Sequence, residues 1–207
     1  MGGRWDEAVA AYRRAVTIDP ELADAQNQLG DVLQGTGRPN AAIAAYREAA
    51  AAAPGSVLGM VAEAKALEGE QRFEEAEAVL RNVIASARRA ETRDAHLLLG
   101  MVLRQLGHFD EAIVHFDEAI DIDPFDVSGY DARANVTRLL PADQPLVERM
   151  LALLEKGLPD PSHATLLFTL GKACDDFGDY AAAIRHFDAA NAIRALAGRL
   201  DRQGLVR

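Results

Sequence analysis

The feature of this sequence that most constrains its fold is a motif that returns about every 34 residues. In each copy an alanine is followed four positions later by a bulky residue and seven positions later by a small or apolar one. Because one short unit cannot bury an apolar face by itself, a repeat of this length predicts units that stack on their neighbours. The alanines are Ala8, Ala42, Ala76, Ala112 and Ala183, at spacings of 34, 34, 36 and 71 residues.

A second set of columns indicates that each unit holds two helices. Turns such as GTGRP, QLGHF and DFGDY, which contain glycine or proline, separate the helices. Small residues at fixed positions let the two helices approach closely, and the bulky residue of the motif fills the space beside them. The upstream helix carries a Leu-Gly pair at Leu29-Gly30, Leu99-Gly100 and Leu170-Gly171. The downstream helix is followed by a proline in three units, at Pro20, Pro54 and Pro124.

A two-helix unit with these columns resembles the tetratricopeptide repeat (TPR). The resemblance implies an all-α fold, a right-handed α-solenoid of stacked antiparallel helix pairs with about eleven helices. One array would then cover 1–207, with a half repeat at 3–20, repeats at about 23–56, 57–92 and 93–126, a degenerate repeat at 127–163, a repeat at 164–197, and a short tail at 198–207.

Two units depart from the pattern. The unit at 57–92 has Ala64 in place of the glycine and Arg88 in place of the proline. In the unit at 127–163, Tyr130 and the segment PLVERMLALLEKGLP fit a helix pair, but the small residues of the motif are blurred. This second unit is the least regular part of the expected array.

The segment 3–20 matches only the second helix of a unit, so part of its apolar face lacks the usual partner. Two interpretations follow: the chain is a fragment of a longer protein, or this face joins a second copy in a homodimer. The residues expected at such a self-association surface are Trp5, Val9, Tyr12 and Val16.

The C-terminal third has a narrower resemblance. Residues 165–202 are similar to the last repeat of bacterial TPR proteins that carry a C-terminal sulfotransferase domain. No loop for a phosphosulfate donor occurs in these 207 residues, so the resemblance assigns no catalytic residue. The matching residues are Phe168, Gly171, Lys172, Asp175, Asp176, Gly178, Tyr180 and Asn191.

Charge and composition exclude several classes of function. The net charge of −10 argues against nucleic acid or an anionic membrane surface as the main partner. No apolar stretch approaches the roughly 20 residues that a bilayer requires. Cys174 is the single cysteine, so no internal disulfide can form, and a cytoplasmic location is expected.

The segment GHFDEAIVHFDEAIDIDP, residues 107–124, looks chemical but fits a scaffold better. His108, Glu111 and His115 have spacings that one helix face could bring together, yet the repeat places His108 in a turn. The equivalents of His115 in other units are Ala11, Ala45, Val79 and His186, and no second ligand cluster has zinc-type spacing. We therefore expect no metal, and the carboxylates are assigned to helix starts and a solvated face.

The remaining catalytic signals are also weak. Gly171-Lys172 lacks the first glycine and the Ser or Thr of a phosphate loop. The glycosylation-like segment Asn135–Thr137 is expected to be helical, in a chain without a secretory signal. No nucleophile has a recognisable partner set, and Cys174 is expected to be an inert packing residue. The prediction is a chain that is not an enzyme and needs no cofactor.

What remains is recognition by the inner face, which the first helix of each unit lines in a TPR array. The chain lacks the Lys and Asn pattern of the carboxylate clamp that binds chaperone tails, and it lacks a long asparagine ladder. The expected function is a non-catalytic scaffold that binds a peptide or protein segment in this groove; the alternative is an accessory region of a modular enzyme, most plausibly a sulfotransferase. The expected groove residues are Asn27, Asp31, Val61, Lys65, Leu97, Met101, Arg104, Asn135, Arg138, Phe168 and Lys172.

Overall fold

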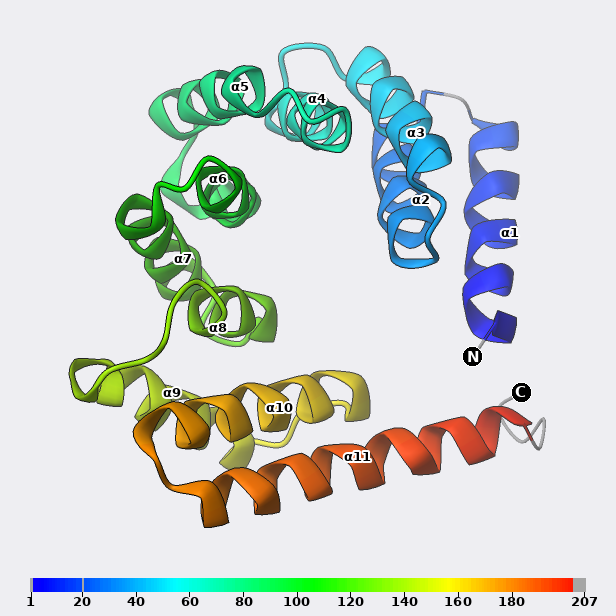
Figure 1. Cartoon of the computed structure of the whole chain (residues 1–207). Coiled ribbons are helices and arrows are strands. Elements are labelled where there is room, and N and C mark those ends of the chain that lie inside the picture. The colour runs from blue at the N-terminus through cyan, green and yellow to red at the C-terminus, as the bar shows by residue number, and fades with distance from the viewer. Residues whose placement is uncertain (1, 20, 203–207) are drawn as a thin grey trace. The chain divides into compact units, whose positions relative to one another are not determined.

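The computed structural model describes residues 2–19 and 21–202, and within these ranges all regular structure is helical (Figure 1). Eleven α-helices and two short 3₁₀ helices occur there, which confirms the expected all-α fold. Pro20, one of the predicted closing prolines, lies outside the described residues. None of the described helices is long and apolar enough to cross a membrane.

The described residues divide into two compact units, the first ending at His115 and the second beginning at Phe116. The helices of the first unit are α1 Gly2–Ile18, α2 Ala23–Gly35, α3 Pro39–Ala52, α4 Val57–Gly69, α5 Phe73–Ser86, η1 Arg89–Glu91 and α6 Arg93–Gln105. Helix α7, Phe109–Ile122, contains the boundary. The second unit continues with α8 Val127–Ala134, η2 Pro141–Asp143, α9 Gln144–Glu155, α10 Asp160–Phe177 and α11 Tyr180–Arg202.

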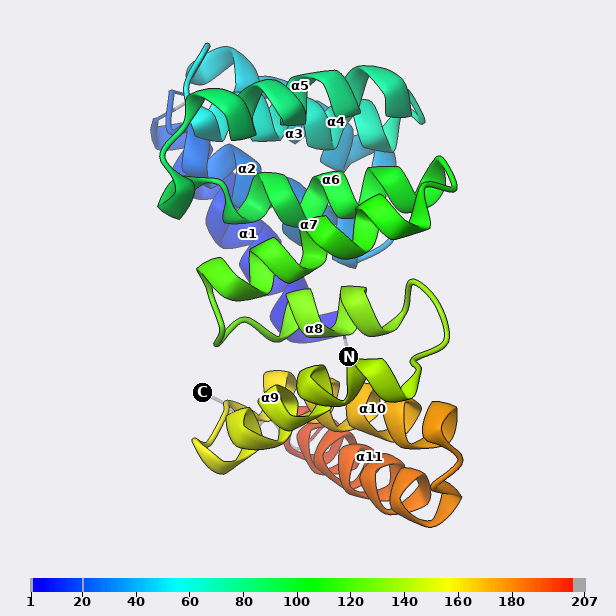
Figure 2. The ribbon, with the colours of Figure 1, turned by 90° about the vertical axis from the view of Figure 1, so that its left-hand side faces the viewer.

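The helices of the first unit pack in sequence order, α1 on α2, α2 on α3, α3 on α4 and α4 on α5 (Figures 1 and 2). Close approach within a pair depends on the glycine of the Leu-Gly column. A Cβ added at Gly30 would come within 2.4 Å of Cε1 of Tyr46, the bulky residue of the same repeat. Ala42 and Ala49 are completely buried beside it, as the motif predicts.

The same rule explains the departure at Ala64. The bulky residue lies sixteen positions after the glycine column, and in this unit it is Leu80 in place of a tyrosine or phenylalanine. Both Ala64 and Leu80 are fully buried. A leucine leaves room for one methyl group where an aromatic ring would not, so the two substitutions compensate each other in volume.

The turns within the repeats follow the sequence signals. Gly37, Gly107 and Gly178 have φ values of +73°, +82° and +83°, a left-handed conformation that glycine adopts without steric strain. Each follows the first helix of a pair, which then reverses into the second. His108 accordingly lies in a turn, exposed to solvent, before α7 begins at Phe109.

In the second unit α10 and α11 lie side by side, and α8 and α9 pack against α10 (Figures 1 and 2). Gly171 repeats the arrangement at Gly30, since an added Cβ would lie 2.4 Å from Cε1 of Phe187. Tyr130 and Met150 are buried in the core of this unit. Helix α11 extends through Arg202, so it enters the segment that the sequence assigns to a tail.

Helix α8 is shorter than the other first helices, and one expectation fails here. It ends at Ala134, so Asn135–Thr137, which were expected to be helical, lie outside the helix. Two β-branched residues, Val136 and Thr137, disfavour continuation, and the Asn135 side chain donates to the Asp131 carbonyl 2.8 Å away. The helix end is therefore capped locally, and the chain leaves the repeat geometry.

Arg133 stands in α8 at the position that Leu29 and Leu99 hold in regular units. It is buried, with Nη2 2.6 Å from Asp143 Oδ1 of η2 and Nε 3.3 Å from Asp117 Oδ1 of α7. Burial raises the pKa of Asp117, and the Arg133 charge opposes that shift. The degenerate unit thus replaces an apolar contact with an ion-paired arginine.

Candidate functional site

Three of the expected groove residues of the first unit are joined by hydrogen bonds. Lys65 of α4 reaches back to α2, where its Nζ lies 2.7 Å from Asp31 Oδ1 and 3.2 Å from Asn27 Oδ1. The Tyr46 hydroxyl donates to the same Asp31 oxygen at 2.8 Å. Burial, followed by the Asp31 charge, raises the pKa of Tyr46, so the phenol keeps its proton and remains a donor. These polar groups link consecutive repeats, and a ligand would have to compete with them.

The expected apolar floor of the first unit is uneven. Val61 is only 4% exposed and belongs to the packing core. Leu97 and Met101, one turn apart on α6, are half-buried, while Arg104 in the last turn is exposed. The area available to a ligand here comes from α6.

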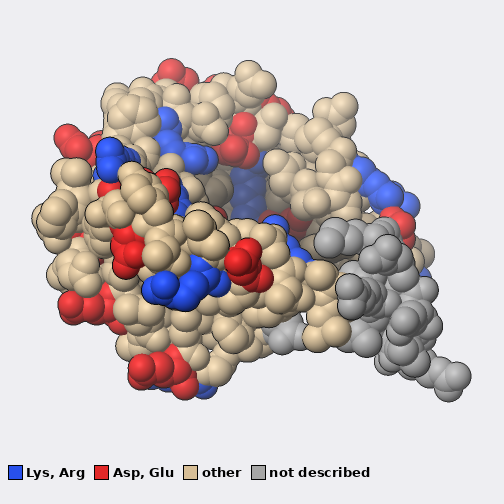
Figure 3. All heavy atoms as spheres, turned by 60° about the horizontal axis from the view of Figure 1, so that its bottom comes forward, with Lys and Arg blue, Asp and Glu red and all other residues tan. Residues whose placement is uncertain are grey.

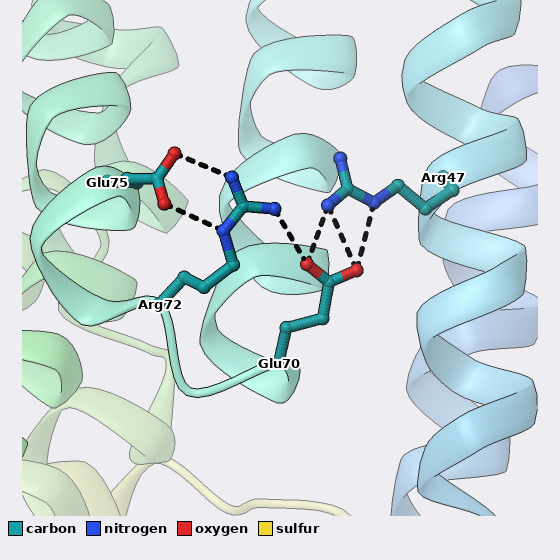
Figure 4. A network of polar contacts seen from close by, with 4 residues as sticks. All are labelled: Arg47, Glu70, Arg72 and Glu75. Atoms are coloured by element: carbon teal, nitrogen blue, oxygen red, sulfur yellow. Dashed lines mark hydrogen bonds and ion pairs between the residues drawn. The ribbon is translucent and has the colours of Figure 1, made fainter.

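An exposed ion network ties α3 to the turn between α4 and α5 (Figure 4). Glu70 accepts hydrogen bonds from Arg47, with Nη2 2.7 Å from Oε2, and from Arg72. Arg72 also binds Glu75, with Nη2 2.6 Å from Oε2. The hydrogen bonds from Arg47 and then Arg72 lower the pKa of Glu70. The charges compensate within the network, which marks it as a structural feature.

The second unit contains an open hollow of about 600 Å³ beside the end of α8. One wall is the irregular segment 135–138, at positions that are helical in α2, α4, α6 and α10. The early end of α8 therefore places this segment at the hollow. The charged, amide and aromatic residues that line the hollow are Asn135, Arg138, Lys172, Asp175, Asp176 and Tyr180.

Arg138 and Asp176 fix the geometry of this wall. Arg138 donates through Nε and Nη2 to the Asp176 carbonyl, at 3.2 and 2.8 Å, in the last turn of α10. The Asp176 carboxylate accepts from Leu139 N–H at 2.9 Å and from Lys172 Nζ. Burial favours a raised pKa for Asp176, but the Leu139 hydrogen bond, Lys172 and Arg138 outweigh it and lower the pKa. The carboxylate therefore stays charged and holds the loop on the helix.

Several polar and aromatic groups at the hollow remain accessible. Asn135, Arg138 and Asp175 are exposed, and Tyr180 at the start of α11 has 64% of its surface exposed. Asn135 uses its amide to donate to Asp131. The arrangement offers donors, an acceptor and an aromatic ring within one concave surface.

Phe168 lies on α10 outside this hollow and is half-buried. Its ring centroid is 6.3 Å from that of Phe187, and the Arg194 guanidinium lies 4.2 Å from its centroid. Arg194 therefore covers one face of the ring through a cation–π contact. Of the two expected groove residues on α10, Lys172 lines the hollow and Phe168 packs toward α11.

The four expected self-association residues on α1 differ in exposure. Trp5 is 50% exposed, and Tyr12 and Val16 are half-buried. Val9 is only 3% exposed, in the cluster that contains Leu29 of α2. The accessible part of this surface is Trp5 with the edges of Tyr12 and Val16.

Two histidines, one on α6 and one on α7, make a contact that the sequence did not predict. His115 lies against His96 of α6, with the two Nδ1 atoms 2.9 Å apart and the ring centroids 5.1 Å apart. Nothing in the repeat columns pairs these two positions.

In the described part of the chain, no three His, Cys, Asp or Glu side chains gather as metal ligands. Cys174 is partly buried, and burial raises the pKa of its thiol.

The hollow is lined by three of the expected groove residues, Asn135, Arg138 and Lys172. Asp176 and Tyr180 also line it, and the repeat columns did not assign them to the groove. The β-branched pair Val136–Thr137 was a usable signal for the end of α8. The contact of Asp176 with Leu139 N–H joins residues 37 positions apart, and no local pattern indicates it.

Comparison with protein families gives a consistent result over most of the chain. A profile described as tetratricopeptide repeat matches residues 61–127 and 147–198. Related profiles, described as TPR repeat and tetratricopeptide repeat, match residues 2–37 and 23–56. No curated protein matches the chain. The comparisons do not show the expected link to sulfotransferase-associated repeats.

Solved structures share the fold at low sequence identity. BtubC (BKLC) from P. vanneervenii is 21% identical over 94% of this chain and 90% of its own, with a TM-score of 0.64. PilF of Pseudomonas aeruginosa is 22% identical over 98% and 89%, with a TM-score of 0.58. YrrB, described as a TPR protein with an unusual peptide-binding site, is 17% identical over 89% and 93%, with a TM-score of 0.53. These likenesses show a common stacked-helix architecture.

Proposed function

Because the chain belongs to the tetratricopeptide repeat family, we propose that it is a non-catalytic scaffold that binds a peptide or protein segment, with the hollow beside the end of α8 as a principal contact site. The observation that carries the proposal is the contrast between groove positions. In the first unit Lys65 binds both Asn27 and Asp31, whereas Asn135 and Arg138, which also make internal hydrogen bonds, line an open hollow.

The size and chemistry of the hollow support a peptide ligand. Its volume of about 600 Å³ is within the usual range for binding sites, and it suits a few side chains of an extended segment. Tyr180 supplies an amphipathic ring at low entropic cost, and Asn135 and Thr137 supply polar groups that can fix the register of a bound backbone. In the first unit, the half-buried Leu97 and Met101 offer apolar contact area for the same class of ligand.

The proposal is tested with a displayed library of random heptapeptides selected on the purified chain. The affinity of enriched peptides is then measured by fluorescence anisotropy for the wild type and for Asn135→Ala/Arg138→Ala. The matched control is Arg185→Ala, an exposed arginine of α11 that does not line the hollow.

We expect the double variant to weaken binding by about fivefold to 150-fold, since two polar contacts at about 0.5–1.5 kcal/mol each are lost. The control should bind like the wild type. Equal affinity of the double variant and the control would remove the hollow from the proposal, and failure to enrich any peptide would contradict peptide binding altogether.

A further inference from the structure

We propose that the hollow recognises a single acidic side chain of the bound segment through Arg138 and rejects runs of acidic residues through Asp175. This inference rests on the proposed function, because it specifies which segment the hollow accepts. It follows from the pairing of the charged groups that line the hollow.

Two of the charges that line the hollow are already paired with each other. Lys172 and Asp176 form an ion pair within α10, four residues apart. The Asp176 carboxylate also accepts the Leu139 N–H bond, and both contacts use Oδ2. Lys172 and Asp176 therefore neutralise each other before a ligand binds.

Arg138 supplies the positive charge that a ligand can use. Among the described residues, no carboxylate lies within ion-pair distance of its guanidinium, whose contacts are the two hydrogen bonds to the Asp176 carbonyl. Those bonds use Nε and Nη2, which leaves Nη1 free for an external acceptor. A carboxylate suits such a donor, because charge-assisted hydrogen bonds to arginine are the stronger class.

The Arg138 side chain is preorganised for a ligand. The Asp176 carbonyl belongs to the last turn of α10, where helix carbonyls lack intrahelical partners. By capping this carbonyl, Arg138 is held in one orientation before any ligand arrives. Binding a carboxylate then requires little further loss of side-chain entropy.

Asp175 is an exposed carboxylate that lines the same hollow. No ion pair of its side chain is present among the described residues, so it offers a second, negative charge. One acidic residue on the ligand can satisfy Arg138, but a second one nearby would meet Asp175. Acidic and basic side chains are similarly interspersed on the face shown in Figure 3, and the chain carries a net charge of −10. The hollow therefore favours an acidic residue flanked by neutral or basic ones.

The test uses four acetylated and amidated peptides: Ala-Leu-Glu-Leu-Ala, the same peptide with Gln or Lys at the centre, and Ala-Glu-Glu-Glu-Ala. Each is titrated into the full ¹⁵N-labelled chain, and dissociation constants are fitted to the shifts of the Leu139 and Gly178 amides and the Arg138 Nε–H. We expect the single-Glu peptide to bind about five- to tenfold tighter than the Gln peptide. The Lys and triple-Glu peptides should bind more weakly than the single-Glu peptide.

Two variants separate recognition from folding. Arg138→Gln should remove the preference for Glu over Gln while the Gln peptide keeps its affinity. Asp175→Asn, which leaves Arg138 and its contacts intact, should strengthen binding of the triple-Glu peptide about threefold or more.

The outcomes distinguish the two proposals. Equal affinities of the Glu and Gln peptides, with shifts at the hollow, would overturn acidic recognition and leave peptide binding in place. An unchanged triple-Glu affinity in Asp175→Asn would overturn the role of Asp175. The absence of shifts at the hollow for every peptide would overturn both the inference and this site of the proposed function.

Discussion

In both α2–α5 and α8–α10 polar groups pair across consecutive repeats, but the two regions differ in where the first helix ends. In α2–α5 the polar groove residues pair across consecutive repeats, as Lys65 does with Asp31, and each first helix runs its full length. In α8–α10 the first helix ends at Ala134, and the segment that follows lines a hollow. The early end of the first helix is therefore what places a concave site in α8–α10.

The core shows the same contrast. Regular repeats place a leucine beside a glycine, and the glycine receives an aromatic ring, as Gly30 receives Tyr46. The degenerate repeat places Arg133 at the leucine position and binds it to Asp143 and Asp117. An ion pair of this kind specifies a geometry without adding the stability of an apolar contact. The degenerate repeat therefore uses charge to position its irregular loop.

The largest expected effect comes from removing this charge. Arg133→Ala should reduce the free energy of unfolding by about 2–4 kcal/mol, because it removes a buried side chain and leaves two carboxylates without their partner. Arg133→Leu, which restores the residue of regular repeats, should reduce it less than Arg133→Ala. Urea unfolding followed by circular dichroism measures both.

The control for this prediction is Arg149→Ala, which removes a more exposed arginine that pairs with Asp121. It should change stability by about 1 kcal/mol or less. If Arg133→Ala were no worse than this control, the ion pair would not be what holds the degenerate repeat.

A somewhat smaller effect is expected in the regular region. Gly30→Ala should destabilise the chain by about 1–3 kcal/mol, because the new methyl group overlaps the Tyr46 ring. Adding Tyr46→Leu reproduces the Ala64/Leu80 pair and should recover part of the loss, with a coupling energy of about 1 kcal/mol in a double-mutant cycle.

Gly35→Ala is the matched control, since an added Cβ at Gly35 meets nothing within 4 Å. Its stability should equal or slightly exceed that of the wild type, because alanine favours the helix. Strict additivity of the Gly30 and Tyr46 substitutions would contradict volume compensation between the two columns.

A smaller effect sharpens the contrast between the two surfaces. Lys65→Met should lower stability by about 0.5–1 kcal/mol, because its ion pair with Asp31 is partly solvated. It should leave the affinity of hollow-binding peptides unchanged. Asn135→Ala should show the opposite behaviour, with weaker peptide binding and little change in stability. Paired urea and anisotropy measurements decide this, and a loss of affinity in Lys65→Met would show that the first unit contributes to the same site.

The smallest expected effect is a pH dependence in the second unit. The folded-state pKa of Asp176 is lowered, so the stabilisation is complete above the unfolded-state value of about 4. It is lost as the pH falls through the lower, folded-state value. The Leu139 amide should therefore exchange faster relative to the rest of the unit below about pH 4. Asp176→Asn should remove this dependence, and an unchanged pH profile in that variant would assign it to other carboxylates.

The sequence was sufficient for the repeat core because its determinants are local and periodic. Ala42, Tyr46, Ala76 and Leu80 are buried where the columns predict. The groove was only partly predictable, because the columns locate Lys65 and Arg138 on similar positions without indicating their partners. Lys65 contacts a residue 34 positions away, and Arg138 one 38 positions away.

The expected helix at Asn135–Thr137 was wrong for a physical reason. Repeat periodicity predicts a helix through these residues. The helix ends earlier because Asn135 caps it locally, and because the next backbone N–H groups donate to the carboxylates of Asp176 and Asp143. Self-association through Trp5 stays a prediction, and the exposure of Trp5 is compatible with it.

The most direct test of the central claim is hydrogen exchange of the full chain, resolved by residue, with and without a peptide selected from the heptapeptide library. We predict that bound peptide slows exchange in 135–140, where the chain departs from the repeat, and in 172–180, across the hollow. Protection confined to α4 and α6 of the first unit would contradict it, because the regular, self-paired surface would then be the one that binds.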